Sequence, residues 1–362
     1  MSSVKNIPSL DLLLSVIIAN HNYEAFLKQA IDSALAVDWP NIEVIVVDDG
    51  STDGSRAIIE SYGSRIAAAC LPKSSQLDVR NHGFAISRGD IISFLDSDDL
   101  LDPAIMQRVM RVWDDQVSKV QVQMGTIDAN GNNLGSNFPR YELTPTADEC
   151  RSWALDTSSY PTPPGSGNVY ARWFLERIFP LDHSCGDATD SCCVTAAPLL
   201  GRVVTIPEVL AFYRVHGNNL GAMADLQPRR LHRQIIRAQQ RFDYMKRIAA
   251  QAGLTVKAGG PEASLHYLMY RAASFRVSPS DHPIHGDSKF LLIRRAYAAA
   301  LEPQGFTPAS TVMIFLWICG IMFAPFAIAQ WLMRIRFDSQ YRADQKHKLK
   351  KLVTFGRLAS AG

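Results

Sequence analysis

The sequence lacks several motifs that would settle its chemistry at once. Its six cysteines are scattered and form no Cys-x-x-Cys pair, so neither a zinc site nor a disulfide framework is expected. It has no Gly-x-x-x-x-Gly-Lys-Ser/Thr loop and no Gly-x-Gly-x-x-Gly after a strand, which argues against ATP hydrolysis and a dinucleotide-binding fold. No basic and then apolar signal peptide opens the chain. We therefore expect the body of the protein on the cytosolic side, where thiols stay reduced.

Excess charge of either sign is also missing. The 362 residues include 37 Lys or Arg and 35 Asp or Glu, a net charge of +2, which argues against a general nucleic-acid binder. The balance is uneven, because residues 334–357 hold eight Lys or Arg and only two Asp, a net charge of +6. The rest of the chain is therefore mildly acidic. The length corresponds to roughly two or three domains. The 47% of hydrophobic residues is ample material for a core.

Residues 303–333 contain no Asp, Glu, Lys or Arg. Within them, residues 311–333 would form a helix about 34 Å long, enough to span a bilayer. The basic tail favours a cytosolic C-terminus, and the body is also expected in the cytosol, so one complete crossing does not satisfy both. We therefore predict a monotopic or re-entrant anchor, bent at Gly320 or Pro325. A simple span and a buried helix of a larger assembly are the alternatives.

Strand and helix patterns alternate over the first 130 residues. Apolar runs predict strands at 12–19, 42–47, 65–70, 90–96 and 120–127. Segments with helical spacing lie between them, at 23–35, 51–63, 78–88 and 102–115. This order predicts an α/β fold, with a Rossmann-like, mostly parallel sheet flanked by helices.

The rest of the chain divides by composition. Residues 131–225 are less regular and would form the second half of the α/β domain that residues 1–130 begin. Residues 226–302 are predicted to be helical, 303–333 to be the hydrophobic membrane-associated segment and 334–362 to be a basic tail.

Three polar clusters follow predicted strands, at 20–23, 48–53 and 96–99. In an open parallel sheet ligands bind at the carboxyl ends of the strands, so we expect the three clusters at one rim. Adjacent carboxylates need a cation, a hydrogen-bonding ligand or solvent. The Asp-Ser-Asp-Asp cluster favours Mg²⁺ or Mn²⁺ bridging to a substrate phosphate, with a helix N-cap as the alternative. Asp48 and Asp49 are better suited to accept hydrogen bonds from a base or ribose.

Four ordered strings carry a family resemblance. They are SVIIANHNYEAFLKQAIDSAL, IEVIVVDDGSTDGS, VRNHGFAISRGDIISFLDSDDLLDP and IPEVLAFYRVHGNN. Over about residues 13–220 the chain resembles a family 2 glycosyltransferase of the GT-A type. The resemblance implies a nucleotide-sugar-binding half at 1–130 and an acceptor-binding half at 131–225.

The resemblance also implies roles for individual residues. Asp49 would contact the nucleotide base, and Ala19 and Asn22 would line the same pocket. Asp96 and Asp98 would form a DxD-like pair, with Asp98 as the direct ligand of Mn²⁺ or Mg²⁺. The remaining implied donor-site residues are Asp48, Ser97 and Arg80, together with His216 as an additional metal ligand.

The family inverts the anomeric centre in one displacement, which requires a carboxylate base. Two candidates precede the string IPEVLAFYRVHGNN: Asp190, which is preferred from its position, and Asp187. The family often shows Glu-Asp-x-Asp followed by Trp and Leu, whereas this chain has Thr189-Asp190-Ser191-Cys192. The alternative is that both are polar loop residues.

The expected function is transfer of a single sugar from a nucleoside-diphosphate sugar, by default a UDP-sugar, to a lipid-linked or saccharide hydroxyl. The resemblance places this in cell-surface glycan or exopolysaccharide synthesis, at the cytoplasmic face of the inner membrane. Two alternatives remain: a sugar nucleotidyltransferase, and a catalytically inactive membrane-bound scaffold with the same fold.

Overall fold

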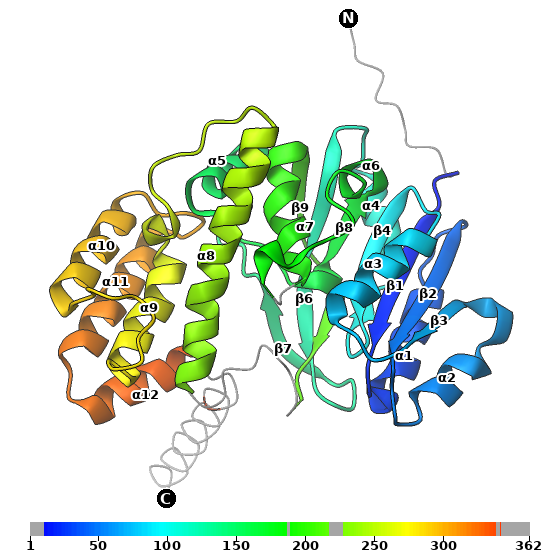
Figure 1. Cartoon of the computed structure of the whole chain (residues 1–362), viewed down its shortest axis with the longest axis horizontal. Coiled ribbons are helices and arrows are strands. Elements are labelled where there is room, and N and C mark those ends of the chain that lie inside the picture. Colours follow the sequence, from blue (N-terminus) through cyan, green and yellow to red (C-terminus); the bar gives the residue numbers. More distant parts are fainter. Residues whose placement is uncertain (1–10, 187–188, 217–226, 338–340, 342–362) are drawn as a thin grey trace, which may run out of the picture. The chain divides into compact units, whose positions relative to one another are not determined.

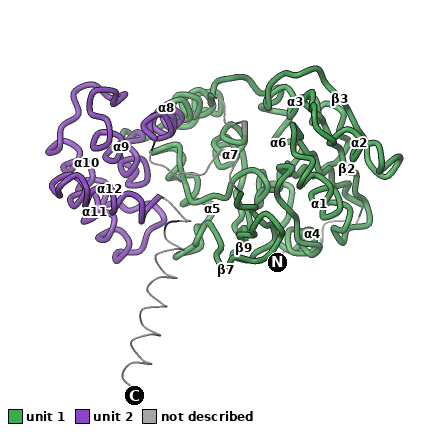
Figure 2. Tube along the Cα trace, turned by 90° about the horizontal axis from the view of Figure 1, so that it is seen from below, with its two compact units in different colours: residues 1–216, 240–258 green, residues 217–239, 259–362 purple. Residues whose placement is uncertain are grey.

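The computed structural model describes residues 11–186, 189–216, 227–337 and 341 (Figure 1). The chain divides into two compact units, which Figure 2 colours separately. Unit 1 comprises residues 1–216 and 240–258, and unit 2 comprises 217–239 and 259–362. Helix α8 (Pro228–Gln251) contributes residues to both units.

The first half of the unit 1 sheet agrees with the sequence. Strands β1 (Leu14–Asn20), β2 (Ile42–Asp49), β3 (Ala67–Leu71) and β4 (Ile91–Asp96) are parallel neighbours in the order β3-β2-β1-β4. The helices in this half are α1 (Glu24–Leu35), α2 (Ser55–Ser61), α3 (Gln76–Ile86) and the short α4 (Ile105–Met110). Helices cover both faces of these strands, which explains why their sequences are continuous apolar runs and not an alternation of apolar and polar residues.

The second half corrects the expected mostly parallel sheet. The sheet continues β4-β8-β6-β9-β5, and β7 pairs with β6. Strand β6 is parallel to β9 but antiparallel to β8 and β7, so the whole sheet is mixed. These strands are β5 (Leu100–Leu101), β6 (Val117–Ile127), β7 (Asn133–Phe138), β8 (Asn168–Ala171) and β9 (Arg202–Arg214). The helices are α5 (Ala147–Thr157), α6 (Arg172–Leu175) and α7 (Thr189–Leu200).

Two apolar cores fill the two faces of the sheet. One side of β1 places Val16 and Ile18 against α1, α2 and α4. The intervening Ile17 packs on the other side, in a core that includes residues of α3, α5, α6, α7 and the unit 1 part of α8. The alternation follows from the two-residue period of a strand. The sheet is thereby fixed between two helical layers, and its strand ends stay open.

Unit 2 is helical, as expected for residues 226–302. It contains α9 (Leu265–Val277), α10 (Lys289–Leu301), α11 (Pro308–Phe323) and α12 (Phe326–Phe337), with the first part of α8. Its core is apolar and includes Leu268, Ala272, Leu292 and Ile318. Buried Arg271 holds the segment before α10, since its Nε lies 2.6 Å from Oδ2 of Asp287.

The charge-free segment folds as two helices instead of one. Helix α11 continues through Gly320 and ends at Phe323, and α12 begins at Phe326, so the break falls at Ala324–Pro325. This agrees with a bend at Pro325 and not at Gly320, because proline disfavours a helical conformation in the residue before it. Within the described ranges, none of the helices combines the length and apolar character that crossing a bilayer requires.

Candidate active site

The strand ends bring the three polar clusters to one edge of the sheet. In the pairing register Asn20 of β1 lies opposite Asp48 of β2, and Ala19 lies opposite Asp96 of β4. Strand β1 therefore lies between the two strands that end in acidic residues, and neighbouring strands are about 4.8 Å apart. Asp49 directly follows Asp48, and Asp98 lies two residues after Asp96. The shared rim that the sequence predicts is confirmed.

Asp48 is a structural carboxylate at this rim. It is fully buried and accepts hydrogen bonds from Asn20 Nδ2 at 2.8 Å and from the Ser51 main-chain nitrogen at 3.0 Å. Burial works to raise its pKa, but hydrogen bonds from Ser51 and Asn20 outweigh burial and lower the pKa. Asp48 thus holds the loops after β1 and β2 together, and its predicted donor contact stays a prediction.

Asn22 and Gly50 shape the same two loops. Asn22 has a positive φ of 57°, and its Oδ1 accepts a hydrogen bond from the Thr52 main-chain nitrogen at 2.8 Å. Gly50 has φ of 66°, and a Cβ there would lie 2.7 Å from the Lys73 main-chain nitrogen. Only glycine fits this turn without displacing that backbone.

Asp49 turns toward the segment that follows β3. Its carboxylate forms an ion pair with Lys73 and accepts hydrogen bonds from the Ser74 main-chain nitrogen at 2.6 Å and Ser74 Oγ at 2.9 Å. Although burial acts to raise it, the pKa of Asp49 is lowered because Lys73 and Ser74 stabilise the charged form. Asp49 is therefore an ionised acceptor, suited to a hydrogen-bond donor on a base.

Asp96 lies between a guanidinium and further carboxylates. Its Oδ1 is 3.2 Å from Nη2 of Arg80, which is buried and stacks over the ring of Phe94. Burial, with Asp98 and Asp190 adding, raises the pKa of Asp96 to about 6, while Arg80 acts to lower it. The charge of Asp190, in the first turn of α7, thus acts on Asp96 across the sheet-to-helix boundary.

Asp98 lies within hydrogen-bonding distance of His216, the histidine that the family resemblance implies as an additional metal ligand. Its Oδ2 lies 2.9 Å from His216 Nε2, and the two residues are 118 positions apart in sequence. The ring of Phe26 packs on the His216 ring with centroids 4.8 Å apart, and Tyr23 meets it edge-on at 5.9 Å. The end of β9 and the start of α1 therefore hold the imidazole against Asp98.

Asp99 is buried beneath this pair. It accepts hydrogen bonds from Ser166 Oγ at 2.6 Å and from the Arg214 main-chain nitrogen at 3.1 Å. Arg214 is itself buried and donates from Nε to the Asp98 carbonyl at 2.8 Å. Burial, then the charges of Asp98 and Asp96, raises the pKa of Asp99 well above its usual range. Neither Ser166 nor Arg214 is identified by the sequence patterns.

The loop 161–167 passes beside the carboxylates. A Cβ on Gly165 would lie 3.1 Å from Arg80 Nη2 and 3.6 Å from Asp96 Oδ2. The loop is anchored by Lys119 of β6, which is fully buried and donates to Thr162 Oγ1 at 2.8 Å and Asn168 Oδ1 at 3.0 Å. The sequence of residues 161–167, PTPPGSG, is typical of a loop, but only the structure shows that the loop lies at the site.

Tyr23 also faces the acidic cluster. Burial, then the charges of Asp98, Asp96 and Asp99, raises its pKa to about 12. The phenol is therefore protonated at neutral pH, and its hydroxyl remains a hydrogen-bond donor beside the carboxylates.

The other predicted residues are placed as follows. Ala19 is the last residue of β1 that pairs with β4, and it lies opposite Asp96. Ser97 is buried in the turn after β4. Asp190 sits at the N-terminus of α7, where the helix dipole favours a carboxylate. Asp187 lies outside the described residues. Asp190 is thus the one base candidate with a described position, and its role as the base stays a prediction.

The predicted metal ligands are only partly assembled. Among the residues with described positions, no three His, Cys, Asp or Glu side chains form a group that could hold a metal ion. Asp98 and His216 are bonded to each other, and Asp96 is bonded to Arg80. The donor set still suits a divalent cation. Burial and the charge of Asp98 raise the pKa values of Asp96 and Asp99, and Arg80 offsets only part of the effect on Asp96. Carboxylate oxygens are ligands that both Mn²⁺ and Mg²⁺ accept.

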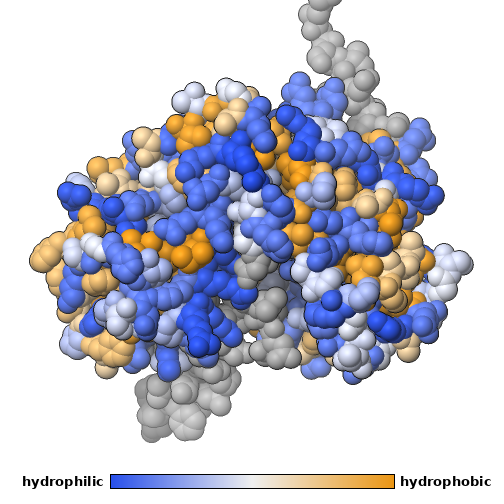
Figure 3. All heavy atoms as spheres, in the orientation of Figure 1, coloured by the Kyte–Doolittle hydropathy of each residue, from blue (hydrophilic) through white to orange (hydrophobic). Residues whose placement is uncertain are grey.

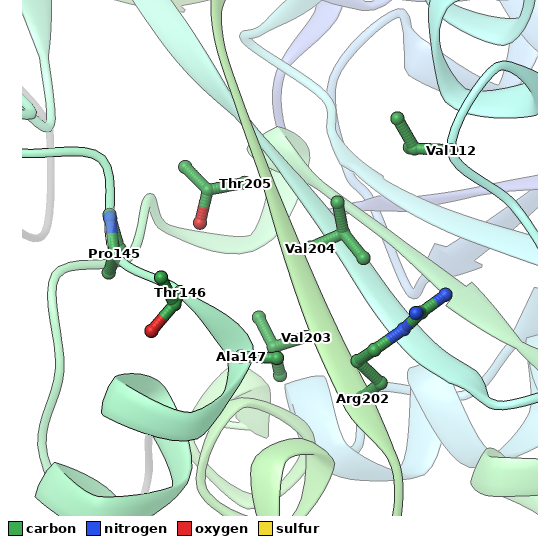
Figure 4. A pocket seen from close by; sticks show the side chains of 8 residues that line it. All are labelled: Val112, Pro145, Thr146, Ala147, Arg202, Val203, Val204 and Thr205. Atoms are coloured by element: carbon green, nitrogen blue, oxygen red, sulfur yellow. The ribbon is translucent and has the colours of Figure 1, made fainter.

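A separate hollow lies at the other end of β9 (Figure 4). It has a volume of about 280 Å³ and is lined by Val112, Pro145, Thr146, Ala147, Arg202, Val203, Val204 and Thr205. Thr205 and Arg214 are about 30 Å apart along the strand at ~3.3 Å per residue. This hollow is therefore not part of the carboxylate site.

Known proteins match this chain in sequence and in fold. The family described as "Glycosyl transferase family 2" matches residues 15–178. An uncharacterized glycosyltransferase of Nostoc sp. is 36% identical over 213 residues, which cover 57% of this chain and 66% of the relative. The uncharacterized glycosyltransferase EpsJ of Bacillus subtilis is 36% identical over 100 residues, which cover 27% of this chain and 29% of EpsJ.

A solved structure agrees with the fold. The crystal structure of S. aureus TarS 1-349 in complex with UDP-GlcNAc has a TM-score of 0.50 and 17% identity, and the match covers 92% of both chains. At that identity the match shows the fold alone. The sequence relatives are matched over no more than about two thirds of their length. Through the domain that contains the strand ends described above, the chain belongs to glycosyl transferase family 2.

Proposed function

We propose that this chain is a metal-dependent, inverting glycosyltransferase. It moves one sugar from a nucleoside-diphosphate sugar to an acceptor hydroxyl. The proposal is supported by the shared strand-end rim that carries Asp49 and Asp98 in a family 2 domain, and by the charge of Asp190, which contributes to raising the pKa of Asp96. The three carboxylates match the three tasks of the reaction: binding the base, holding the diphosphate through a cation, and taking a proton.

Asp49 binds the donor at its base. Its carboxylate is ionised and fixed by Lys73 and Ser74, so it can accept a hydrogen bond without rearranging. Asn22 borders the same loops and orients them through Thr52. The base is thereby held at the β2 end, and the diphosphate extends along the rim toward β4.

Asp98 would hold the cation, with Asp96 and His216 completing its surroundings. A bound Mn²⁺ or Mg²⁺ supplies Lewis-acid stabilisation of the diphosphate charge that develops as the sugar leaves. Arg80 and the Tyr23 hydroxyl add a positive charge and a hydrogen-bond donor beside the same carboxylates. Asp99 keeps the turn in place through Ser166 and Arg214.

Asp190 is the base. As the acceptor oxygen bonds to the anomeric carbon, its proton passes to the Asp190 carboxylate, and the bond from that carbon to the diphosphate oxygen breaks. Asp190 lies in the first turn of α7. A single displacement of this kind inverts the anomeric centre.

The acceptor in this proposal is a lipid-linked saccharide at the cytoplasmic face of the membrane, in cell-surface glycan or exopolysaccharide synthesis. Support comes from the charge-free residues 303–333 and the basic residues after them. A uridine nucleotide is the first donor to test, since the likeness in fold includes a protein solved with UDP-GlcNAc.

Donor turnover tests the proposal. The full chain is incubated with UDP-, GDP- and dTDP-sugars, with Mn²⁺ or with EDTA, and nucleoside diphosphate release is measured. Release that needs Mn²⁺ and falls at least about hundredfold in Asp98→Asn supports the proposal. Formation or consumption of pyrophosphate would instead indicate a nucleotidyltransferase. If no donor binds or is turned over, the result would favour the alternative of a catalytically inactive scaffold.

A further inference from the structure

Unit 2 exposes an unusual number of large apolar side chains. Phe290 is 76% exposed and Tyr297 57% on α10, and Val312 is 56%, Leu316 60% and Phe323 60% exposed on α11. We call these five residues the apolar face of unit 2. Residues 290–331 hold ten of the fifteen exposed large hydrophobic residues found in the described part of the chain. Such concentration marks an interaction surface, since scattered exposed hydrophobics are the ordinary case.

The apolar face is not a by-product of core packing. Helix α11 buries Ile314, Ile318 and Ile321 in the unit 2 core, and Val312, Leu316 and Phe323 lie on its opposite side. A surface helix of a globular unit ordinarily carries polar residues there. Helix α11 is instead apolar all round while only one side of it is covered.

The apolar face continues from one helix to the next. The rings of Phe290 and Phe323 lie 6.3 Å apart, and that of Tyr297 lies 6.0 Å from Phe315 on α11. Figure 3 shows apolar colours among hydrophilic ones at the left edge, where Figure 1 draws α10 and α11. The face is therefore one surface across two helices and not a row of isolated residues.

The sequence that carries the apolar face, and the sequence that follows it, are rich in positive charge. Residues 288–337 contain Lys289, Arg294, Arg295, Arg334 and Arg336 but a single acid, Glu302. The sequence after them, through Arg357, adds six Lys or Arg and two Asp. Arg295 pairs with Glu262, while Lys289 and Arg294 are exposed on α10 beside the apolar face.

We propose that the apolar face of unit 2 docks on a bilayer surface that contains anionic lipid. The proposal rests on the proposed function, because a lipid-linked acceptor requires the enzyme at a membrane. Phe290, Leu316 and Phe323 enter the interface between headgroups and acyl chains, and the flanking Lys and Arg side chains bind the headgroup phosphates. The amphipathic ring of Tyr297 suits the headgroup level.

The charges favour a bilayer over a second copy of this chain. Two copies meeting through this face would bring two basic surfaces together, and like charges at an interface oppose association. An anionic bilayer complements both parts of the surface at once, the apolar centre and the basic surroundings.

Vesicle co-sedimentation tests the proposal on the full chain. The protein is mixed with vesicles of phosphatidylcholine alone, or of phosphatidylcholine with phosphatidylglycerol. The triple variant Phe290→Ser/Leu316→Ser/Phe323→Ser should lose more than about tenfold in partitioning to the anionic vesicles. The matched control is Leu134→Ser/Leu143→Ser, which removes exposed leucines from unit 1 and should bind like wild type.

A second variant tests how much the positive charges contribute to vesicle binding. Arg334→Gln/Arg336→Gln should weaken binding to anionic vesicles by about fivefold per charge and leave binding to neutral vesicles unchanged. Added salt should reduce the wild-type preference for anionic vesicles in the same direction. Equal binding to both vesicle types would overturn the role of the charges.

Two results would overturn the proposal as a whole. One is unchanged vesicle binding by the triple variant. The other is a wild-type dimer in sedimentation without lipid that the triple variant converts to monomer, which would assign the face to self-association. Donor hydrolysis in detergent-free buffer separates this inference from the proposed function. It should be equal in wild type and triple variant, so its absence in both would count against the transferase and not against the docking face.

Discussion

His216 Nε2 lies 2.9 Å from Asp98 Oδ2, although the two residues are 118 positions apart in the chain. The end of β9 thereby closes on the turn after β4, and Arg214 secures the closure by binding the Asp98 carbonyl. The contact links the turn after β4, in the first half of the unit 1 sheet, to the segment after β9, in the second half. In the proposed enzyme it lies where the donor diphosphate is held.

Replacing Asp98 should therefore abolish most turnover. We expect Asp98→Asn to lower nucleoside diphosphate release at least about hundredfold, because the amide has no charge to bind a cation. Asp115→Asn is the matched control, since Asp115 is exposed on the loop before β6. A steady-state assay with Mn²⁺ measures both variants. Equal rates for Asp98→Asn and wild type would contradict the assignment.

The base assignment makes a separate prediction. Asp190→Asn should lower kcat for transfer by about 10²–10⁴-fold, because no other group would take the acceptor proton. Its affinity for the nucleoside diphosphate, measured by calorimetry, should stay that of wild type. Asp187→Asn is the comparison and should retain activity. The opposite pattern would move the base to Asp187.

Asp49 should affect donor binding more than the chemical step. Asp49→Ala removes the carboxylate that Lys73 and Ser74 hold in place. We expect the Kd for the nucleoside diphosphate to rise by about tenfold, the worth of one hydrogen bond to a charged group. At saturating donor, kcat should change little. A loss confined to kcat would mean that Asp49 does not bind the base.

Gly165 should tolerate no side chain without loss of activity. A Cβ at this position would lie 3.1 Å from Arg80 Nη2, so Gly165→Ala pushes on the guanidinium that pairs with Asp96. We expect kcat to fall by about tenfold, as for other small misplacements near a reacting centre. Circular dichroism should show an unchanged fold. Full activity would mean that Arg80 adjusts freely.

Buried Lys119 predicts a pH dependence of stability. Burial lowers its pKa to about 7, whereas the unfolded lysine keeps its proton up to about pH 10.4. Between these values the unfolded state binds more protons, so this contribution to stability rises with pH. It is most unfavourable below pH 7 and disappears as pH approaches 10.

The comparison with Lys119→Met isolates this contribution. Urea unfolding at pH 7.5, 8.5 and 9.5 should show wild type gaining on the variant by about 1 kcal/mol per pH unit. Other titrating groups cancel in the difference, because both proteins share them. A stability difference that does not change with pH would mean that Lys119 remains charged in the folded protein.

The first half of the site could be predicted from sequence because its geometry follows from local rules. Each buried strand ends in a polar cluster, and parallel neighbours place those ends together. Asn20, Asp48 and Asp96 therefore meet without knowledge of the rest of the fold.

The second half could not be predicted in the same way. Ser166 and Arg214 reach Asp99 from a loop and from the end of β9, and only tertiary packing places them. Lys119 lies in a strand that is buried over most of its length, where its charge argues against burial. Helix α7, which carries Asp190, has Pro198 in its interior, a residue that ordinarily argues against a helix.

In the proposed enzyme, acidic residues from separate strand ends bind one donor and one cation. Crystals of the full chain grown with Mn²⁺ and UDP test this directly through the anomalous scattering of manganese. We expect a manganese peak beside Asp98, with the diphosphate bound to it and the uracil at Asp49. A manganese ion or a nucleotide bound away from both residues would contradict it.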